Sequence, residues 1–192
     1  MPSQPSTQQP NGNAGVDSGF LSSIMEIRKR ARQSMEEGAV TPSYSLDKEK
    51  VIELLNEALA TELVCVLRYR RHYFMAEGIN SEAIKKEFLT HANEELQHAD
   101  QIAERIVQLG GEPDFQPNVI GKRSHSEYKE GSDLRDMLRE NLIAERIAIE
   151  SYREMVNFIG THDSTTRRML EEILAVEEHH ADDMASLIKR VG

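Results

Sequence analysis

The sequence has 192 residues, with 33 acidic and 23 basic side chains and a formal net charge of −10 at pH 7. This length suits one domain with appendages, and the acidic balance argues against a general nucleic-acid binder. The single cysteine, Cys65, excludes an internal disulfide framework, and no apolar run approaches the ~20 residues of a membrane span. Since no export signal is recognisable at the N-terminus, we expect a soluble, cytoplasmic protein.

The N-terminal region differs in composition from the rest. Residues 1–19 are rich in Pro, Gln, Ser, Asn and Gly and contain no Lys or Arg, which predicts a disordered tail. Apolar residues then recur at helical spacing from Phe20 to Met35, and Gly38 follows as a stop. We therefore predict an amphipathic helix and a linker over residues 20–44.

The main body, residues 45–192, has the hydrophobic period of helices, and Gly and Pro fall almost only between the helical stretches. Capping residues in front and glycines behind delimit these stretches. Four long helices are predicted, over about residues 47–77, from Ser81 to Gly110, from Ser132 to Gly160, and from Asp163 or Ser164 onward. Each is ~28–30 residues, or roughly 42–45 Å long, so the predicted fold is an all-α four-helix bundle.

The connections predict how the helices are paired. The links after the first and third helices are a few residues long, which makes each of these pairs an antiparallel hairpin. The middle link, from Gly110 to Gly131, contains Pro113, Pro117 and Gly121 and could run the length of the bundle. The bundle is therefore expected to consist of two hairpins joined by one long crossover.

Near the middle of each predicted helix, charged side chains interrupt the stripe of apolar residues. Steps of three and four residues keep these side chains on one face of each helix. The acidic and imidazole residues on the four stripes are Glu62, Glu95, His98, Glu145, Glu177 and His180. Burying four carboxylates costs several kcal/mol per ion, so either they hold protons or cations lie among them.

Four carboxylates and two imidazoles match a known dinuclear ligand set, in which two helices supply Glu and two supply Glu-x-x-His. Mixed oxygen and nitrogen ligands favour Fe or Mn over Ca, and the lack of further cysteines excludes iron–sulfur clusters. The spacing is a second argument, because Glu62 to Glu95 is 33 residues and Glu145 to Glu177 is 32. The two hairpins therefore look like a duplication.

Structural interpretations compete with each assignment. A single one of these glutamates could be a surface residue displaced by one helical step, and a single histidine could be an ordinary core residue. The agreement of all six in face, depth and spacing favours the metal centre. Each half also has a tyrosine seven residues after its first glutamate, Tyr69 and Tyr152. Tyr69 is a candidate catalytic residue with a redox role, and core packing is its alternative.

Four other residues lie near the candidate ligands in sequence. Cys65 is predicted to be a small buried filler, with participation in redox chemistry as the alternative. His91, His179 and Glu94 flank the ligands and are predicted to be solvated. Glu94 is also a candidate for a site of ion transit.

From Ser45 to Gly192 the chain resembles the ferritin-like superfamily, and most closely its bacterioferritin branch. The resemblance is carried by Glu62-Leu-Val-Cys-Val-Leu-Arg-Tyr69, Glu95-Leu-Gln-His98-Ala-Asp100, Glu145 in Ala-Glu-Arg, and Glu177-Glu-His-His180. It implies two iron ions per subunit, held by Glu62 with His98 and by Glu145 with His180, and bridged by Glu95 and Glu177. It also implies that Tyr69 is a tyrosine near the centre that can donate an electron.

Three departures qualify the resemblance. Leu96 stands where bacterioferritins have a heme-binding methionine, so heme is not expected. The sequence ends twelve residues after His180, which leaves no room for the fifth helix of 24-subunit ferritins and is similar to the Dps-like mini-ferritins. A homo-oligomer of 12 subunits is therefore favoured over 24. The helix over residues 20–37 is an addition to the bacterioferritin pattern.

The expected function is that of a ferroxidase and iron-storage or detoxification protein. Fe(II) would be oxidised with O2 or H2O2 at the di-iron site inside each subunit, and Fe(III) would be stored in a hollow cage. Manganese is the alternative metal. The net charge of −10, repeated over a cage, would attract Fe2+.

Two other functions remain open at this point. A rubrerythrin-type peroxidase usually has an additional four-cysteine iron domain, which this chain cannot supply; a manganese peroxidase or catalase is a variant. A DNA-protecting Dps-like protein usually carries a Lys-rich tail, which residues 1–19 lack. The bases of residues 20–37 are accompanied by acids, so DNA binding is not expected.

Overall fold

The computed structural model describes residues 23–78 and 81–191. Over these residues the regular structure is entirely helical, which confirms the predicted all-α class. The predicted tail over residues 1–19 and Phe20 lie outside the described part. The elements are α1 (Ile24–Arg30), the short 3₁₀ helix η1 (Met35–Glu37), α2 (Lys48–Met75), α3 (Ser81–Gln108), α4 (Pro117–Arg123), α5 (Leu134–Ile159) and α6 (Ser164–Val191).

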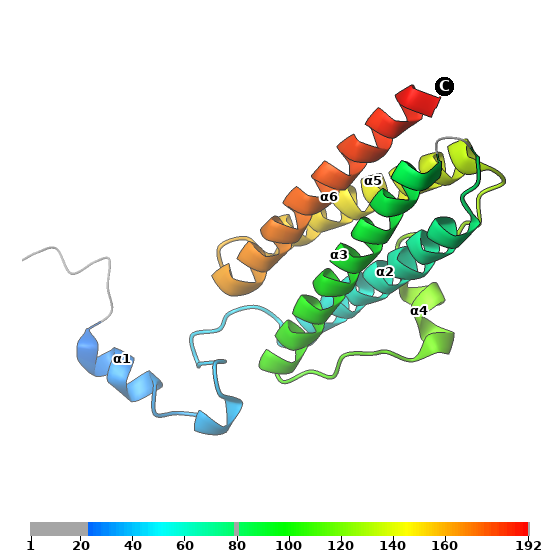
Figure 1. Cartoon of the computed structure of the whole chain (residues 1–192). Coiled ribbons are helices and arrows are strands. Elements are labelled where there is room, and N and C mark those ends of the chain that lie inside the picture. The colour runs from blue at the N-terminus through cyan, green and yellow to red at the C-terminus, as the bar shows by residue number, and fades with distance from the viewer. Residues whose placement is uncertain (1–22, 79–80, 192) are drawn as a thin grey trace, which may run out of the picture.

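The four long helices form two antiparallel hairpins (Figure 1). Helix α2 packs against α3, and α5 packs against α6, while α2 with α5 and α3 with α6 close the bundle. The crossover between the hairpins carries α4, which packs on α2. The predicted four-helix bundle with one long crossover is confirmed. None of the helices among the described residues has the length and apolar character needed to cross a membrane.

Capping residues set the helix boundaries close to the predicted ones. The Asp47 carboxylate accepts a hydrogen bond from the Lys50 N–H at the start of α2, and Asp133 accepts one from the Asp136 N–H at the start of α5. Gly160 ends α5 with φ of +54°, a backbone conformation that other residues rarely adopt. These local signals are readable from sequence, which explains why the boundaries agree.

The N-terminal region is less regular than the predicted helix over residues 20–37. Helix α1 ends at Arg30, and Ser34 has φ of +47°, so the chain leaves the helical conformation before η1 begins. No residue of α1 is buried, and a short helix without packing is only marginally stable. The linker is anchored further on, where the Tyr44 hydroxyl donates to Asp163 Oδ2 at 3.1 Å.

Helix α4 was not among the predicted elements. Pro117 stands at its first turn, where the missing N–H costs nothing and the fixed φ suits a helix. The side chain of Asn56 holds the irregular segment before α4, because its Nδ2 donates to the Glu112 carbonyl and its Oδ1 accepts from the Asp114 N–H. These contacts join residues distant in sequence, so the sequence pattern of the link did not reveal the helix that it contains.

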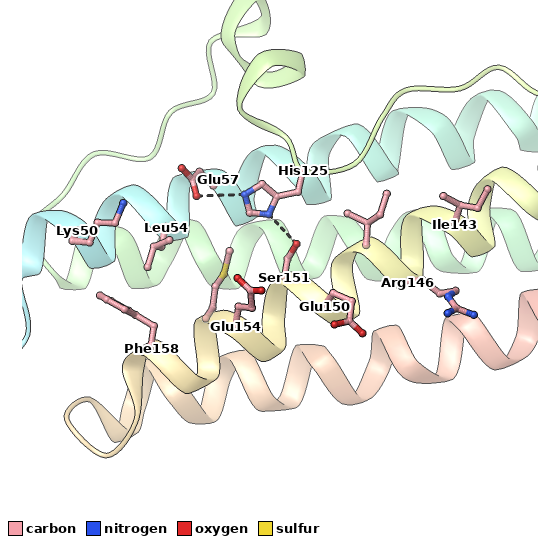
Figure 2. A pocket seen from close by; sticks show the side chains of 12 residues that line it. Lys50, Leu54, Glu57, His125, Ile143, Arg146, Glu150, Ser151, Glu154 and Phe158 are labelled. Atoms are coloured by element: carbon pink, nitrogen blue, oxygen red, sulfur yellow. Dashed lines mark hydrogen bonds and ion pairs between the residues drawn. The ribbon is translucent and has the colours of Figure 1, made fainter.

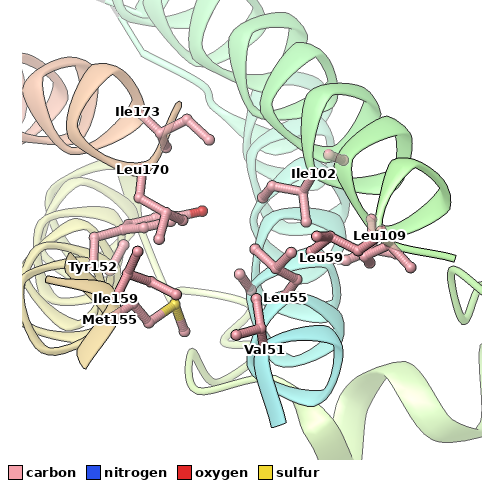
Figure 3. Close-up of a cluster of buried hydrophobic side chains, with 14 of the residues drawn as sticks. Val51, Leu55, Leu59, Ile102, Leu109, Tyr152, Met155, Ile159, Leu170 and Ile173 are labelled. Carbon is pink, nitrogen blue, oxygen red and sulfur yellow. The ribbon is translucent and has the colours of Figure 1, made fainter. Parts of the chain in front are cut away.

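The apolar core is divided into two clusters by the polar middle of the bundle. One cluster, shown in Figure 3, includes Val51, Leu59, Ile102, Ile159 and Leu170. The other includes Tyr69, Phe88, Leu138 and Met184. On every long helix the candidate metal ligands lie between the residues of these two clusters. Apolar side chains therefore cover the candidate ligands on both sides along the bundle axis.

Candidate metal centre

The structure brings the six predicted ligands together at the middle of the bundle. Helix α2 supplies Glu62 and α5 supplies Glu145, while α3 and α6 each supply a glutamate and a histidine one turn later. None of the six is more than 5% exposed. Carboxylates buried this deeply require protons or cations as partners.

The ligand atoms fall into two overlapping groups. One atom from each member of a group lies within 4.8 Å of the others. The groups are Glu62, Glu95, His98 and Glu177, and Glu95, Glu145, Glu177 and His180. Glu95 and Glu177 belong to both, so the geometry offers two neighbouring cation positions that share two carboxylates.

Both histidines turn the same ring atom toward the carboxylates. The Nδ1 atom of His98 lies 2.9 Å from Glu177 Oε1, 3.3 Å from Glu95 Oε2 and 3.4 Å from Glu62 Oε2. The Nδ1 atom of His180 lies 3.4 Å from Glu95 Oε1 and 3.5 Å from Glu177 Oε2. An imidazole nitrogen in each group is thus available as a metal ligand.

Unsatisfied atoms provide a test of whether cations fit. Among the described residues, eight buried side-chain nitrogen and oxygen atoms make no aligned hydrogen bond, and six of them belong to this cluster. These six are Glu62 Oε2, Glu95 Oε1, Glu145 Oε2, both Glu177 oxygens and His180 Nδ1. Buried polar atoms are rarely left without partners. Unsatisfied oxygen and nitrogen ligands gathered at one point fit two divalent transition-metal ions.

Without a cation, the cluster must hold protons. Burial, followed by the charge of Glu95, raises the pKa of Glu62 to about 8, and burial with the charges of Glu95 and Glu177 raises the pKa of Glu145 well above its ordinary value. Burial acts against a charged His180, but hydrogen bonds with Glu177 and Glu95 raise its pKa to about 12. Imidazolium and protonated carboxyl groups therefore neutralise the metal-free site.

Glu62 and Glu145 each belong to only one of the two ligand groups, and we call them the outer carboxylates. Each accepts a hydrogen bond from a tyrosine of the other hairpin. The Tyr69 hydroxyl on α2 donates to Glu145 Oε1 on α5, and the Tyr152 hydroxyl on α5 donates to Glu62 Oε1 on α2. Burial and the adjacent carboxylates raise the pKa of both phenols, so they remain hydrogen-bond donors. Tyr152 was not among the predicted site residues, although the duplicated spacing of the two tyrosines contains the signal.

The predicted solvated position of His91 is wrong. His91 is 2% exposed, its Nδ1 lies 3.2 Å from the Tyr69 hydroxyl oxygen, and its ring stacks on His180 at 3.9 Å between centroids. It precedes Glu95 by four residues, which places it on the same face of α3, so the helical period could have identified it. His179 is exposed, as predicted.

Glu94 is partly exposed and contacts the centre. Its Oε2 accepts a hydrogen bond of 2.8 Å from Nε2 of His180. This bond holds a proton on Nε2, so Nδ1, which is protonated in the metal-free imidazolium, is the atom that would bind a cation. Glu94 is therefore placed to orient the His180 ring while its side chain remains partly exposed.

A buried arginine beside the centre was not predicted. Arg68 is fully buried; its Nε donates to Asn141 Oδ1 at 2.9 Å and its Nη1 donates to the Glu127 carbonyl. Arg68 Nη2 donates a hydrogen bond of 3.4 Å to Sγ of Cys65, which is buried as predicted. Burial raises the pKa of the Cys65 thiol well above its ordinary value, so it stays protonated.

A large groove lies away from this centre. A groove of about 710 Å³ between α2 and α5 is lined by apolar side chains such as Leu54, Ile143 and Phe158 (Figure 2). Its polar side chains include His125, which contacts Glu57 and Ser151. None of the six candidate ligands lines this groove. The groove is therefore separate from the candidate metal centre.

Comparison with known proteins agrees with this geometry. Residues 52–191 match the family model of the ferritin-like domain. The bacterioferritin of Desulfovibrio desulfuricans is 30% identical over 152 residues, which cover 76% of this chain and 79% of that protein. A structure of that bacterioferritin, described with its diiron site in different catalytic states, has a TM-score of 0.67 at 26% identity and covers 75% of this chain and 81% of that one.

Two other solved structures are similar. A dodecameric thioferritin, the bacterioferritin-related protein of Bacteroides fragilis, has a TM-score of 0.74 at 33% identity and covers 76% of this chain and 88% of that one. Dps from Thermosynechococcus elongatus has a TM-score of 0.71 at 19% identity, covers 73% of this chain and 91% of that one, and shows the fold alone.

Proposed function

Because the chain belongs to the ferritin-like family, we propose that it oxidises Fe(II) at the centre described above and stores the Fe(III) in a homo-oligomeric cage. The observation that carries this proposal is the pair of buried ligand groups that share Glu95 and Glu177. Two neighbouring positions of this kind suit a reaction in which two metal ions act together.

Each candidate ligand then has a distinct role. Glu62 and His98 hold one iron, Glu145 and His180 hold the other, and Glu95 with Glu177 bridges them. Two Fe(II) ions bound in this way supply one electron each to O2 or H2O2. The division agrees with the two groups of atoms that lie within 4.8 Å of one another.

The surrounding residues orient these ligands and hold protons. Tyr69 and Tyr152 donate hydrogen bonds to the two outer carboxylates and fix their direction. Glu94 keeps the His180 proton on Nε2, away from the iron. Tyr69, at hydrogen-bond distance from a carboxylate of the centre, is also the proposed electron donor.

We propose a cytoplasmic cage of 12 subunits. Its support is the likeness, at 33% identity, to the dodecameric protein of Bacteroides fragilis. The net charge of −10 per chain would favour the accumulation of Fe2+ around such an assembly. No heme is assigned, because Leu96 stands where bacterioferritins have a heme-binding methionine.

The ferroxidase proposal is tested by a pair of adjacent histidines on α6. His180→Ala removes a ligand of one iron, whereas His179→Ala removes an exposed imidazole one residue away. We expect the first variant to lose rapid Fe(II) oxidation, followed as Fe(III) absorbance after mixing, and the second to retain the rate of the unaltered protein. Equal rates in all three proteins would refute the assignment of the site.

Storage is tested separately from oxidation. After loading with Fe(II), the particle mass and the iron atoms retained per particle are measured, with O2 and with H2O2 as oxidant. A cage that retains far more than two iron atoms per subunit supports storage. Turnover of peroxide without retained iron would instead indicate a peroxidase, and the metal content of the isolated protein distinguishes iron from manganese.

A further inference from the structure

Another group of side chains that could hold a metal ion contains none of the six ligands of the centre. It consists of Glu87 and His91 on α3 and Asp183 on α6, with one ligand atom of each within 4.8 Å of the others. His91 is 2% exposed, whereas the Asp183 side chain is 36% exposed. The group is therefore closed on the side of the bundle interior and open to solvent at Asp183.

The hydrogen bonds of Tyr69 determine the tautomer of His91. A phenol has one proton to donate, and that of Tyr69 goes to Glu145. This step rests on the proposed function, because Glu145 has no proton of its own when it binds iron. The Tyr69 oxygen can then only accept from His91, so the ring proton is on Nδ1, which lies 3.2 Å away.

This tautomer leaves a lone pair on His91 Nε2 that faces the carboxylate of Asp183. Nε2 lies 3.5 Å from Asp183 Oδ2, longer than an ordinary hydrogen bond. A cation between these two acceptors would bind both of them, and the Glu87 carboxylate supplies a third ligand atom within reach. We propose that Glu87, His91 and Asp183 bind a third divalent transition-metal ion.

The composition of the group indicates the class of metal. One imidazole and two carboxylates suit Fe2+ or Zn2+ better than Ca2+, which prefers oxygen ligands alone. The contact between Nδ1 and Tyr69 fixes the ring of His91, as the partner of a metal-binding histidine usually does. The His91 ring stacks on His180 at 3.9 Å, so this third site adjoins the dinuclear centre.

Zinc provides a test that does not depend on iron oxidation. The full-length, metal-free protein is titrated with Zn2+ by calorimetry, and the bound zinc per subunit is then counted by elemental analysis. The unaltered protein is expected to bind three equivalents. Asp183→Ala is expected to bind two, while Asp182→Ala, which removes the neighbouring exposed carboxylate, keeps three. Glu87→Ala should lose the same equivalent as Asp183→Ala.

Further outcomes separate this site from the proposed function. Glu95→Ala is expected to lose zinc from the dinuclear centre, and adding Asp183→Ala to it should remove one equivalent more. Should zinc bind only to the group at Asp183, the third site would stand and the dinuclear proposal would fail. Equal zinc content in the unaltered protein and Asp183→Ala would overturn the third site.

Discussion

Tyr69 and Tyr152 occupy equivalent places in the two hairpins. Each phenol is buried, and each crosses to the glutamate on the opposite helix. A hydrogen bond that orients a metal-binding carboxylate commonly changes metal affinity by ~10–100-fold when it is lost. The two residues therefore allow a positioning role to be compared with a redox role at the same depth in the core.

We expect Tyr152→Phe to weaken metal binding by ~10-fold or more, because Glu62 loses the donor that orients it. Tyr69→Phe should weaken metal binding similarly and, in addition, slow Fe(II) oxidation at saturating iron if Tyr69 donates an electron. Calorimetry with Zn2+ measures the first effect and the oxidation rate measures the second. Identical oxidation rates in the two variants would exclude an electron-transfer role specific to Tyr69.

The residues of the centre differ in how far sequence could predict them. Glu95 and His98 lie on an apolar stripe, where a charged side chain is conspicuous. His91 lies on the same stripe, one turn before Glu95, so its burial was readable from the helical period although it was predicted to be solvated. Arg68 gave no signal, because its partners come from residues 127 and 141, which only the fold brings near.

At the scale of the helices, a buried polar network joins α2 to α5. Asn141 Oδ1 on α5 accepts from Arg68 Nε at 2.9 Å and lies 3.1 Å from His72 Nδ1. All three side chains are buried. Since α2 and α5 belong to different hairpins, this single amide oxygen helps to hold the two halves together.

Asn141→Ala is expected to lower the free energy of unfolding by about 2–3 kcal/mol, because the buried Arg68 guanidinium loses an acceptor. Asn157→Ala, at an exposed position of the same helix, is the matched control and should change stability by less than ~0.5 kcal/mol. Urea denaturation measures both variants. Equal stabilities would show that the amide oxygen of Asn141 does not support the bundle.

The long helices were predictable because period, caps and glycines agree along each of them. The short elements were not. Helix α4 has seven residues and is held by contacts of Asn56 with the crossover, while α1 has no buried residue to sustain the length that its apolar pattern predicted. Local patterns therefore determined the bundle, and tertiary contacts determined its connections.

At the scale of the whole molecule, the proposed cations would replace protons as the neutralising charge of the core. The ordinary pKa of Glu62 is 4.5 and burial raises it to about 8, so between these pH values the folded chain holds a proton that the unfolded chain releases. The stability of the metal-free protein should therefore fall as the pH rises through this window. His180, with a pKa raised to about 12, acts in the same direction above its ordinary value of 6.5.

We expect Zn2+ to raise the Tm, and to raise it more at pH 8 than at pH 6, because fewer protons must be displaced at the higher pH. At a free metal concentration about 100 times Kd, the gain of ~2.7 kcal/mol corresponds to roughly 5–10 °C. Scanning calorimetry with and without Zn2+ at the two pH values measures the difference. A gain that is equal or smaller at pH 8 would contradict this exchange of protons for metal.

The division of ligands between the hairpins has a mechanical consequence. Each cation position takes three side chains from one hairpin and a single carboxylate, Glu95 or Glu177, from the other. An axial slip of one half by a single helical turn, about 5.4 Å, would carry that carboxylate out of reach. The affinity for cations therefore depends on the axial registry of the two hairpins. A bundle whose hairpins have slipped would lose cation binding while its helical content is still intact.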